Sequence, residues 1–393
     1  MEKTAYKELE NKFEDLVNIR RDLHMYPELS FEEERTPTII ANYLRDLGLE
    51  VKTGVGGRGV TALLKGAKPG KTVALRADFD ALPIQDEKTV PYKSKIPGVM
   101  HACGHDIHTA SLLGAAYALS KVKEHLQGNV MFIHQFAEEV LPGGAKAMIE
   151  DGCLNNVDVV YGAHVLSNLP VGQILFKEEY MMAAGDKFEI VIKGKGGHGS
   201  SPHLAVDPVL IGSQIVTNVQ QIIASRINTT DPAVITICSF DGASRYNIIP
   251  DQVILSGTVR TFSEEARELS EKYIRRVAEA TCSGAGAECV VTYEYGYPSV
   301  CNNSEEALRI KRIGEKIVGK ENVSESSLQM AMEDFSYYVK EKPGAFFNVG
   351  GMNPAIQAVY SHHHPKFDVD EQSITLAGKM FISLVFDYLN SSH

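Results

Sequence analysis

The segment from His101 to His108 concentrates side chains that could bind a metal ion. It contains Cys103, His105, Asp106 and His108, follows a Pro-Gly turn and opens a helical pattern. Thiolate and imidazole are ligands that divalent transition metals prefer. The alternative is a structural one, in which an aspartate caps a helix beside a buried cysteine and the histidines are incidental. Taken alone, the segment favours a metal site over this alternative.

Three further groups could take part in the same chemistry. Glu138 and Glu139 follow a predicted strand, so one carboxylate could bind a metal while the other acts as a base. His164 closes another predicted strand, and Ser361–Pro365 contains three consecutive histidines. By itself, an adjacent acidic pair is more typical of a solvated loop, and a lone histidine at a strand end is more often structural.

The predicted strands and helices bring these groups together. Strands that alternate with helices indicate a mostly parallel or mixed sheet with helices on both faces. Asp78, Glu138, Glu139 and His164 would then lie at the carboxyl ends of strands, where open α/β sheets bind ligands. Apolar runs and helical periodicity predict helices at about 6–25, 36–47 and 106–119, and strands at about 72–77, 129–136 and 157–164.

A different pattern begins near Gly185. Strands at about 186–193, 233–240, 252–261 and 288–295 alternate with helices at about 206–225 and 264–282. The order β-α-β-β-α-β is that of a split βαβ, ferredoxin-like α+β unit. We therefore predict an α/β protein with a discontinuous catalytic metal-binding domain, residues 1–183 and 298–393, and an inserted lid and dimerisation domain, residues 184–297.

The composition restricts the classes of partner and compartment. A net charge of -11 argues against a nucleic-acid partner, because binding phosphates requires clustered lysine and arginine. No apolar run approaches the length of a membrane span, and the first residues do not resemble a signal peptide. The six cysteines are scattered without a Cys-x-x-Cys pair, as expected for free thiols in a reducing compartment. We therefore expect a cytoplasmic protein with no membrane partner.

Six short motifs, in order along almost the whole chain, resemble the M20 family of metallopeptidases and amidohydrolases. The likeness is to its aminoacylase-like branch, which includes hippurate hydrolases, indole-acetyl-amino-acid hydrolases and N-acetyl-diaminopimelate deacetylases. Each motif alone is weak, whereas the ordered set is specific. The matching segments are 21–30 (Arg-Asp-Leu-His-Met-Tyr-Pro-Glu-Leu-Ser), 76–83 (Arg-Ala-Asp-Phe-Asp-Ala-Leu-Pro), 101–108, 135–139, 196–200 (Gly-Gly-His-Gly-Ser) and 363–367.

The resemblance implies a centre of two divalent ions in each subunit. By position, the ligands would be Cys103, His105, Glu139, His164 and His363, with Cys103 as the bridge. His363 is preferred to its neighbouring histidines because the family's ligand stands two residues before the proline. Mn²⁺ or Zn²⁺ is expected, and Ni²⁺ or Co²⁺ also fits the family.

The same resemblance implies roles for residues around the metals. Asp78 would orient a ligand, and Glu138 would be the general base. His198 of one subunit would polarise the scissile carbonyl in its partner's site, which implies a homodimer or a larger homo-oligomer. Substrate contacts are expected from Asn247, Arg260 and the backbone of Gly350, although for Asn247 and Arg260 ordinary strand-surface polarity is an equal alternative.

We therefore predict a metal-dependent amidohydrolase that cleaves small N-acyl amino acids or related N-acyl compounds. A dipeptidase or carboxypeptidase of the same family is the nearest alternative, since no motif shows whether the acyl group carries an amine. A hydrolase with Cys103 as nucleophile is another alternative, but it would leave Glu139, His164 and His363 without a role. A non-catalytic binding protein on the same scaffold should have lost a ligand or the base, and every expected position is filled.

Overall fold

The structure, a computed structural model, describes residues 1–390. The chain divides into two compact units. The first comprises Met1–Met181, Val300–Ser327 and Asp334–His393, and the second comprises Met182–Ser299 and Leu328–Glu333. The insertion expected at residues 184–297 lies wholly within the second unit, which also includes a short segment from later in the chain.

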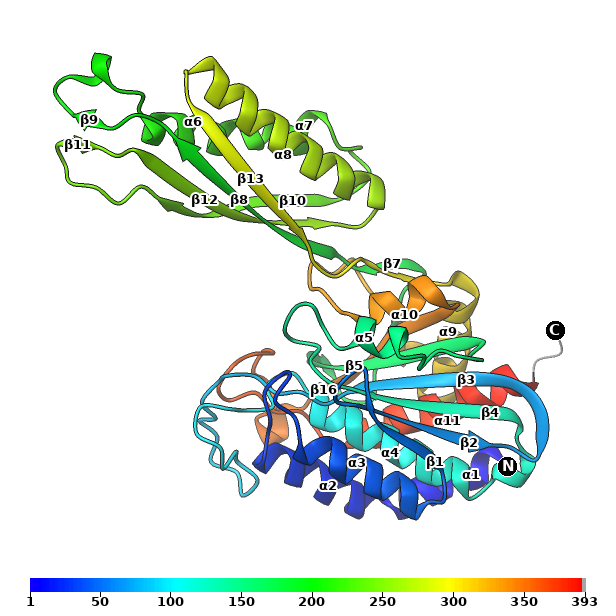
Figure 1. The fold of residues 1–393 in the computed structure, drawn as a ribbon. Helices are drawn as coiled ribbons and strands as arrows, with labels where there is room; N and C mark the ends of the chain where they lie inside the picture. The colour runs from blue at the N-terminus through cyan, green and yellow to red at the C-terminus, as the bar shows by residue number, and fades with distance from the viewer. Residues whose placement is uncertain (391–393) are drawn as a thin grey trace. The chain divides into compact units, whose positions relative to one another are not determined.

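An eight-stranded sheet forms the centre of the first unit (Figure 1). In sheet order its strands are β1 (Glu50–Val55), β2 (Gly59–Lys65), β4 (Gln127–Gln135), β3 (Lys68–Asp78), β5 (Val159–Pro170), β16 (Gly344–Met352), β6 (Ile174–Phe176) and β15 (Val323–Glu325). The central pairs β4–β3, β3–β5 and β5–β16 are parallel, whereas β1–β2, β2–β4 and β16–β6 are antiparallel. The predicted α/β class with a mixed sheet is confirmed.

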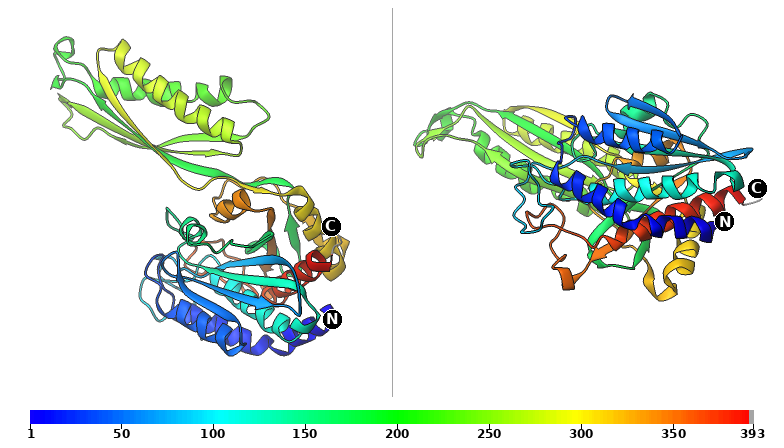
Figure 2. Two further views of the ribbon diagram at one scale, coloured as in Figure 1. Left: turned by 45° about the vertical axis from the view of Figure 1, so that its right-hand side comes forward. Right: turned by 90° about the horizontal axis from the view of Figure 1, so that it is seen from below.

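Helices cover the sheet on both faces, as Figures 1 and 2 show. α1 to α4 and α11 lie on one face, and α5 and α10 on the other. α4 is buried all round because it packs against α2, α11 and β3, and its small apolar residues suit that position. The helices are α1 (Glu2–Asn11), α2 (Phe13–Met25), α3 (Arg35–Asp46), α4 (His105–Ser120), α5 (Ala145–Glu150), α9 (Ser304–Val318), α10 (Phe335–Glu341) and α11 (Gln372–Asn390). Short 3₁₀ turns occupy Lys123–His125, Lys320–Asn322 and Pro354–Ile356, and β7 (Glu179–Met182) pairs with β14 (Val300–Asn302).

The second unit has the expected β-α-β-β-α-β order. Its antiparallel sheet runs β10-β12-β8-β13, and its core consists of apolar side chains from these strands and from the helices. The elements are β8 (Ala184–Lys193), β9 (Gly197–His198), a 3₁₀ turn (Pro202–Leu204), α6 (Pro208–Val219), α7 (Gln221–Ser225), β10 (Ala233–Asp241), β11 (Ile248–Ile249), β12 (Gln252–Thr261), α8 (Glu264–Gly284) and β13 (Glu288–Tyr295).

Two predicted helices are each divided in the structure. The helix expected at 6–25 becomes α1 and α2, because the N–H of Lys12 turns to Leu9 O, three residues back. The helix expected at 206–225 becomes α6 and α7, which meet at Gln220. α6 starts at Pro208 because the Asp207 carboxylate accepts the N–H of Val209 at 2.9 Å.

The sequence pattern predicts that His164 ends its strand, and this prediction is wrong. β5 continues to Pro170 because it remains paired with β16 beyond the point where β3 ends. The last residues paired between β3 and β5 are Arg76 and Gly162. His164 therefore lies two residues further along, beside the carboxyl end of β3. Among the helices within residues 1–390, none is long and apolar enough to cross a membrane.

Candidate metal centre

The loop before α4 places Cys103 and His105 at the carboxyl edge of the sheet. Gly104 has φ of 92°, a left-handed conformation in which glycine is least strained. A Cβ at this position would lie 2.3 Å from Val165 Cγ1, so the loop also packs too closely against β5 for a side chain. The glycine thus brings the two candidate ligands onto β5 next to His164.

The ring of His105 is oriented by Asp80. Its Nδ1 lies 3.0 Å from both the backbone oxygen and Oδ1 of Asp80, so Nδ1 carries the proton and donates it. The lone pair is therefore on Nε2. This atom is buried and has no hydrogen-bond partner among the described residues. The hydrogen-bond pattern is that of a histidine prepared to bind a metal through Nε2.

His164 is fixed in the same tautomer. Its Nδ1 donates to the backbone oxygen of Val165 at 2.7 Å, which leaves the Nε2 lone pair directed at Cys103 Sγ, 3.4 Å away. Cys103, His105 and His164 each contribute one ligand atom to a group whose atoms all lie within 4.8 Å of one another.

Glu139 and His363 form a second group with the same thiol. Glu139 Oε1 lies 3.3 Å from His363 Nε2 and 3.8 Å from His105 Nε2, but it has no hydrogen-bond partner among the described residues. Cys103, Glu139 and His363 also lie within 4.8 Å of one another. The two groups share Cys103, which is the arrangement needed for a thiolate that bridges two ions.

Of the three consecutive histidines, His363 is the one that faces this cluster. Its backbone adopts φ of 63°, and its N–H donates to Ala102 O at 2.8 Å. The ring of His362 packs against that of His164, with centroids 5.2 Å apart, but its Nε2 is used to accept the N–H of Ser167 at 3.2 Å. His364 stacks on Tyr360, on the surface.

Asp78 and His108 form a buried pair beside the cluster. Asp78 accepts from His108 Nδ1 at 2.6 Å and from Arg76 at 2.7 Å, and it lies 3.9 Å from His105 Nε2. His108 Nε2 accepts the N–H of Val165 at 2.9 Å, so both its nitrogens are in use. His108 is therefore not available as a ligand, and the hydrogen bonds of Asp78 are made to His108 and Arg76.

Asp80 is the residue that the sequence analysis missed. Besides His105, its carboxylate accepts the N–H of Glu139 at 3.0 Å and the hydroxyl of Ser30 at 2.7 Å. The signal was present, because Asp80 stands two residues after Asp78 in one of the quoted motifs. In an extended segment, residues two positions apart point to the same side, so this spacing does not show which of the two acids holds the ligands.

The electrostatics of the cluster favour a cation. Burial lowers the pKa of His105, but Asp78, Asp80 and Glu139 outweigh it and raise that pKa to about 10. Burial also raises the pKa of the Cys103 thiol, and Glu139 and Glu138 raise it further. The acids thus stabilise positive charge and oppose a thiolate unless a cation is present. Neither His105 Nε2 nor Glu139 Oε1 has a hydrogen-bond partner among the described residues, and a cation that displaces the proton of His105 Nε2 would find two buried ligand atoms there, so the residues fit a metal centre.

Glu138 lies beside this cluster. It is buried, with 7% of its surface exposed, and it groups with His105 and Glu139 within the same 4.8 Å limit. The carboxylate of Glu138 is therefore close to any ion that Glu139 binds.

Gly350 is the remaining predicted site residue of the first unit. Gly350 has both backbone groups occupied, since its N–H donates to Gln173 O and its oxygen accepts from Ser373, each at 2.8 Å. It is glycine because a Cβ would lie 1.8 Å from Pro170 O, and its N–H is already used within the first unit.

His198, Asn247 and Arg260 belong to the second unit. His198 is exposed on β9, which pairs with β11, and Gly199 N–H donates to Asn247 O at 2.9 Å, so His198 and Asn247 are neighbours (Figure 1). Arg260 is half-buried on β12 and donates to Val259 O at 3.0 Å. It has no salt bridge to a residue within 1–390.

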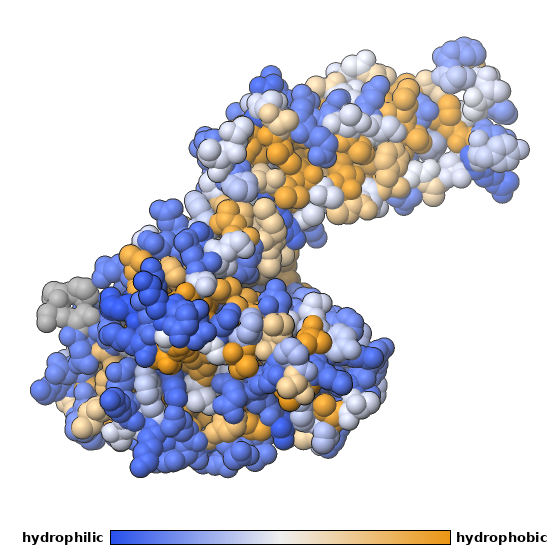
Figure 3. Space-filling view, turned by 180° about the vertical axis from the view of Figure 1, so that it is seen from behind, coloured by the Kyte–Doolittle hydropathy of each residue, from blue (hydrophilic) through white to orange (hydrophobic). Residues whose placement is uncertain are grey.

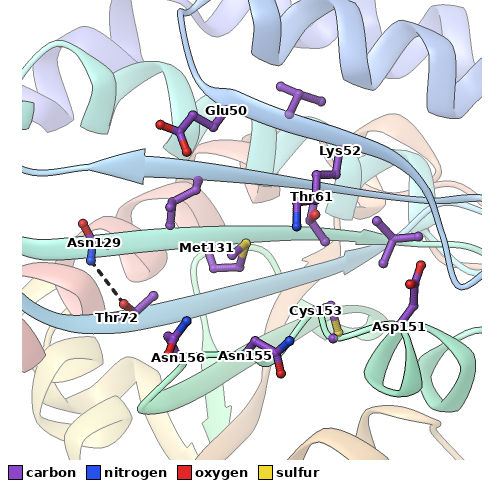
Figure 4. A pocket seen from close by; sticks show the side chains of 14 residues that line it. Glu50, Lys52, Thr61, Thr72, Asn129, Met131, Asp151, Cys153, Asn155 and Asn156 are labelled. Carbon is purple, nitrogen blue, oxygen red and sulfur yellow. Dashed lines mark hydrogen bonds between the residues drawn. The ribbon is translucent and has the colours of Figure 1, made fainter.

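A cavity of about 730 Å³ lies elsewhere in the first unit (Figure 4). It is bordered by β1, β2, β3, β4 and the segment 151–156, and none of the predicted site residues lines it. Cys153 lines this cavity, and burial raises the pKa of its thiol to about 12, which makes that cysteine a poor nucleophile. The cavity lacks a group of potential ligand atoms like the one around Cys103.

Comparison with known proteins identifies the family of this chain. The model of peptidase family M20/M25/M40 matches residues 74–387. The chain belongs to the M20 family. It is 49% identical over 388 residues to the Bacillus subtilis protein named "Putative amidohydrolase YhaA", covering 99% of this chain and 98% of that one. As a member of the M20 family with such relatives, it is a metal-dependent amidohydrolase.

Other M20 relatives carry more specific names. Thermostable carboxypeptidase 1 of Saccharolobus solfataricus is 41% identical, covering 95% of each chain. N-acetylcysteine deacetylase of Bacillus subtilis is 40% identical, covering 94% of this chain and 95% of the relative. Among solved structures, a Bacillus subtilis protein described as a dinuclear metal-binding M20 peptidase is 36% identical with a TM-score of 0.86, covering 98% of this chain and 100% of that one.

The contacts of Asp80 predict that Asp80→Asn weakens metal binding. An asparagine amide would face the N–H of Glu139 or the proton of His105, so two candidate ligands would lose their orientation. Affinity should fall by about 10- to 100-fold, the usual effect of removing a group that holds a ligand. Calorimetric titration of chelator-stripped protein with Mn²⁺ measures it. Ser30→Ala, which removes only one neutral hydrogen bond from the same carboxylate, is the control, and equal affinities in both variants would contradict the prediction.

Proposed function

We propose that the protein hydrolyses the amide bond of N-acyl amino acids or related small N-acyl compounds. The observation that carries this proposal is the pair of ligand groups that share Cys103, with Glu138 buried next to them. The names of the relatives support an amide substrate, and the deacetylase in particular supports a small acyl group.

Two divalent ions would be held by the five predicted ligands. Cys103, His105 and His164 would hold one ion, and Cys103, Glu139 and His363 the other. Thiolate and imidazole suit Zn²⁺ or Mn²⁺ within the family's range, and Ni²⁺ or Co²⁺ also fits the donor set. Such ions supply Lewis acidity and a water that is easier to deprotonate.

Glu138 would be the general base. Its carboxylate is buried beside Glu139, so it can accept a proton from the attacking water and return it to the departing nitrogen. Asp80, through His105 and the N–H of Glu139, would hold two ligands in place, and Asp78 would support the same region through His108 and Arg76.

His198 would stabilise the oxyanion in the site of a partner subunit. Its Nδ1 accepts from the Ser200 N–H at 3.1 Å and lies 2.9 Å from its hydroxyl, so the neutral ring carries its proton on Nε2. That N–H is the donor that a developing oxyanion requires. Exposed apolar side chains such as Leu210 and Phe240 support a homodimer through this unit, along which Figure 3 shows hydrophobic residues gathered.

Arg260 and Asn247 would recognise the carboxylate of an N-acyl amino acid. Arg260 has no salt bridge within the described chain, so its guanidinium can form a two-pronged contact with a carboxylate. We further propose that the partner is a small molecule rather than nucleic acid or membrane, and that the protein acts in the cytoplasm, as the acidic composition and the free cysteines suggest.

A dipeptidase or carboxypeptidase is the second candidate function. It is favoured by the identity to a carboxypeptidase over most of both chains. A cysteine nucleophile is disfavoured, because burial, together with Glu139 and Glu138, raises the pKa of the Cys103 thiol instead of lowering it. A purely binding protein would not need Glu138 buried beside the ligands.

The proposal predicts hydrolysis that depends on metal. Chelator-stripped protein should be inactive on acetyl, benzoyl and indole-acetyl amino acids, and Mn²⁺ or Zn²⁺ should restore activity. The release of free amine measures turnover, and dipeptides in the same panel test the second candidate. Undiminished activity after the ions have been removed would favour the thiol mechanism, and inactivity at full occupancy by two ions would overturn the amidohydrolase proposal for these substrates.

Glu138→Gln should lose about 10²- to 10⁴-fold in kcat, because a neutral amide cannot accept the proton of the water. Its metal content should remain that of the wild type, which elemental analysis can verify. The matched variant is Glu139→Gln, in which metal should be lost as well. Near-normal turnover by Glu138→Gln would remove this residue from the role of base.

His198→Ala should fold and bind metal yet be nearly inactive. If His198 acts across a dimer, mixing this variant with inactive Glu138→Gln should restore about a quarter of the total wild-type activity, because about half of the dimers in an equal mixture are hybrids and one of the two sites in each hybrid is complete. Subunit exchange is followed by mass spectrometry of differently tagged chains. Exchange without any recovery would contradict action across subunits.

A further inference from the structure

The motif at residues 21–30 has no part in the proposed chemistry. Two side chains of α2, one just before this motif and one within it, are nevertheless completely buried. Arg20 and His24 have 0% of their surface exposed. Burying a guanidinium and an imidazole is costly unless partners satisfy them. Their partners therefore show which parts of the molecule these two residues hold together.

Both side chains bind the carboxylate of Asp106, in the first turn of α4. Arg20 Nε donates to Oδ2 at 2.7 Å, and His24 Nδ1 lies 2.8 Å from the same oxygen. Asp106 directly follows His105 and stands three residues after Cys103. These contacts therefore anchor the start of α4, where two proposed ligands lie.

Lys88 connects His24 to the loop that carries His363. Lys88 Nζ lies 2.7 Å from His24 Nε2 and donates to Phe367 O at 2.8 Å. An ammonium group can only donate, so His24 Nε2 accepts, and Nδ1 carries the proton that goes to Asp106. His24 thus has both nitrogens in use and a single tautomer.

Arg20 makes the same connection by a second route. Its Nη2 donates to Asp368 Oδ1 at 2.8 Å, in the loop just after Phe367. Next to Lys88, the N–H of Glu87 donates to Pro365 O at 2.9 Å. Three contacts from two segments therefore reach the stretch 365–368.

We propose that Arg20, His24 and Lys88 form a clamp that holds the start of α4 and the loop 363–368 at a fixed separation. The inference rests on the proposed function, because it takes Cys103, His105 and His363 as ligands. The two segments also touch directly, since His363 N–H donates to Ala102 O. The clamp acts through other residues, so its members are positioning residues and not catalytic ones.

The clamp affects the two ions unequally. One set of ligands consists of Cys103 and His105, just before and at the start of α4, and His164 on β5. These two segments pack on one another at Gly104. The other set needs His363, whose loop depends on Lys88 and Arg20. Loss of the clamp should therefore weaken mainly the ion held with His363.

The test is a two-step Co²⁺ titration of chelator-stripped, full-length protein, followed by calorimetry and by the visible spectrum of Co²⁺. In Lys88→Met, which removes both donations, one step should weaken by about 10- to 100-fold while the other changes much less. Arg309→Met is the matched control. It breaks a buried ion pair with Glu306 (2.7 Å) in α9 of the same unit, and both of its steps should remain those of the wild type.

Thermal unfolding of the stripped proteins separates positioning from general loss of stability. Lys88→Met should melt no lower than Arg309→Met and still bind one of the two ions more weakly, by the factor given above. If Lys88→Met fails to fold, His24→Asn decides, since its amide can still donate to Asp106 but cannot reach Lys88. Two unchanged steps in a folded clamp variant would overturn the clamp. Wild-type protein that binds no Co²⁺ would overturn the proposed function itself.

Discussion

Asp80 joins the two parts of the chain that the candidate centre requires. Its carboxylate accepts from His105 at the start of α4, from the N–H of Glu139 after β4, and from Ser30. One fixed anion therefore sets the direction of two candidate ligands that are 34 positions apart in the sequence, at 105 and 139. Because Asp80 is completely buried, water competes little for these bonds, and they are correspondingly strong.

This arrangement has an electrostatic consequence. Asp78, Asp80, Glu138 and Glu139 gather at one edge of the sheet, and Arg76 pairs with Asp78 through Oδ2, the oxygen that lies 3.9 Å from His105 Nε2. Arg76 is itself shared with Asp334, so its charge does not balance the acids around His105. Burial raises the pKa of Asp78 and of Asp80, but His105 and their other partners outweigh it and lower both, so positive charge at His105 stabilises these carboxylates. Divalent ions would supply that positive charge in place of a proton on His105. Under the proposed function, bound ions would therefore stabilise this edge of the sheet as well as supply its chemistry.

Much of this edge could be predicted from the sequence, because hydrophobic runs locate strands and the carboxyl ends of parallel strands meet at one side. Cys103, His105, Glu139, His164 and His363 were expected together and lie together. What could not be predicted depends on side-chain direction. The choice between Asp78 and Asp80, the extension of β5 past His164, and the occupied backbone of Gly350 all follow from pairings between distant segments. The break between α1 and α2 arises from the local backbone hydrogen bond of Lys12, which the hydrophobic periodicity of the sequence does not reveal.

Under the proposed function, the two units divide the work between reaction and recognition. The ligand groups and Glu138 all lie in the first unit, whereas His198, Asn247 and Arg260 all lie in the second. A metal centre alone can activate water, but it holds an acyl amino acid only weakly and gives no donor to the oxyanion. Substitutions in the second unit can therefore change which substrate is held without disturbing the ions. Because an interaction accelerates a reaction only when it strengthens in the transition state, His198 should affect kcat and Arg260 mainly KM.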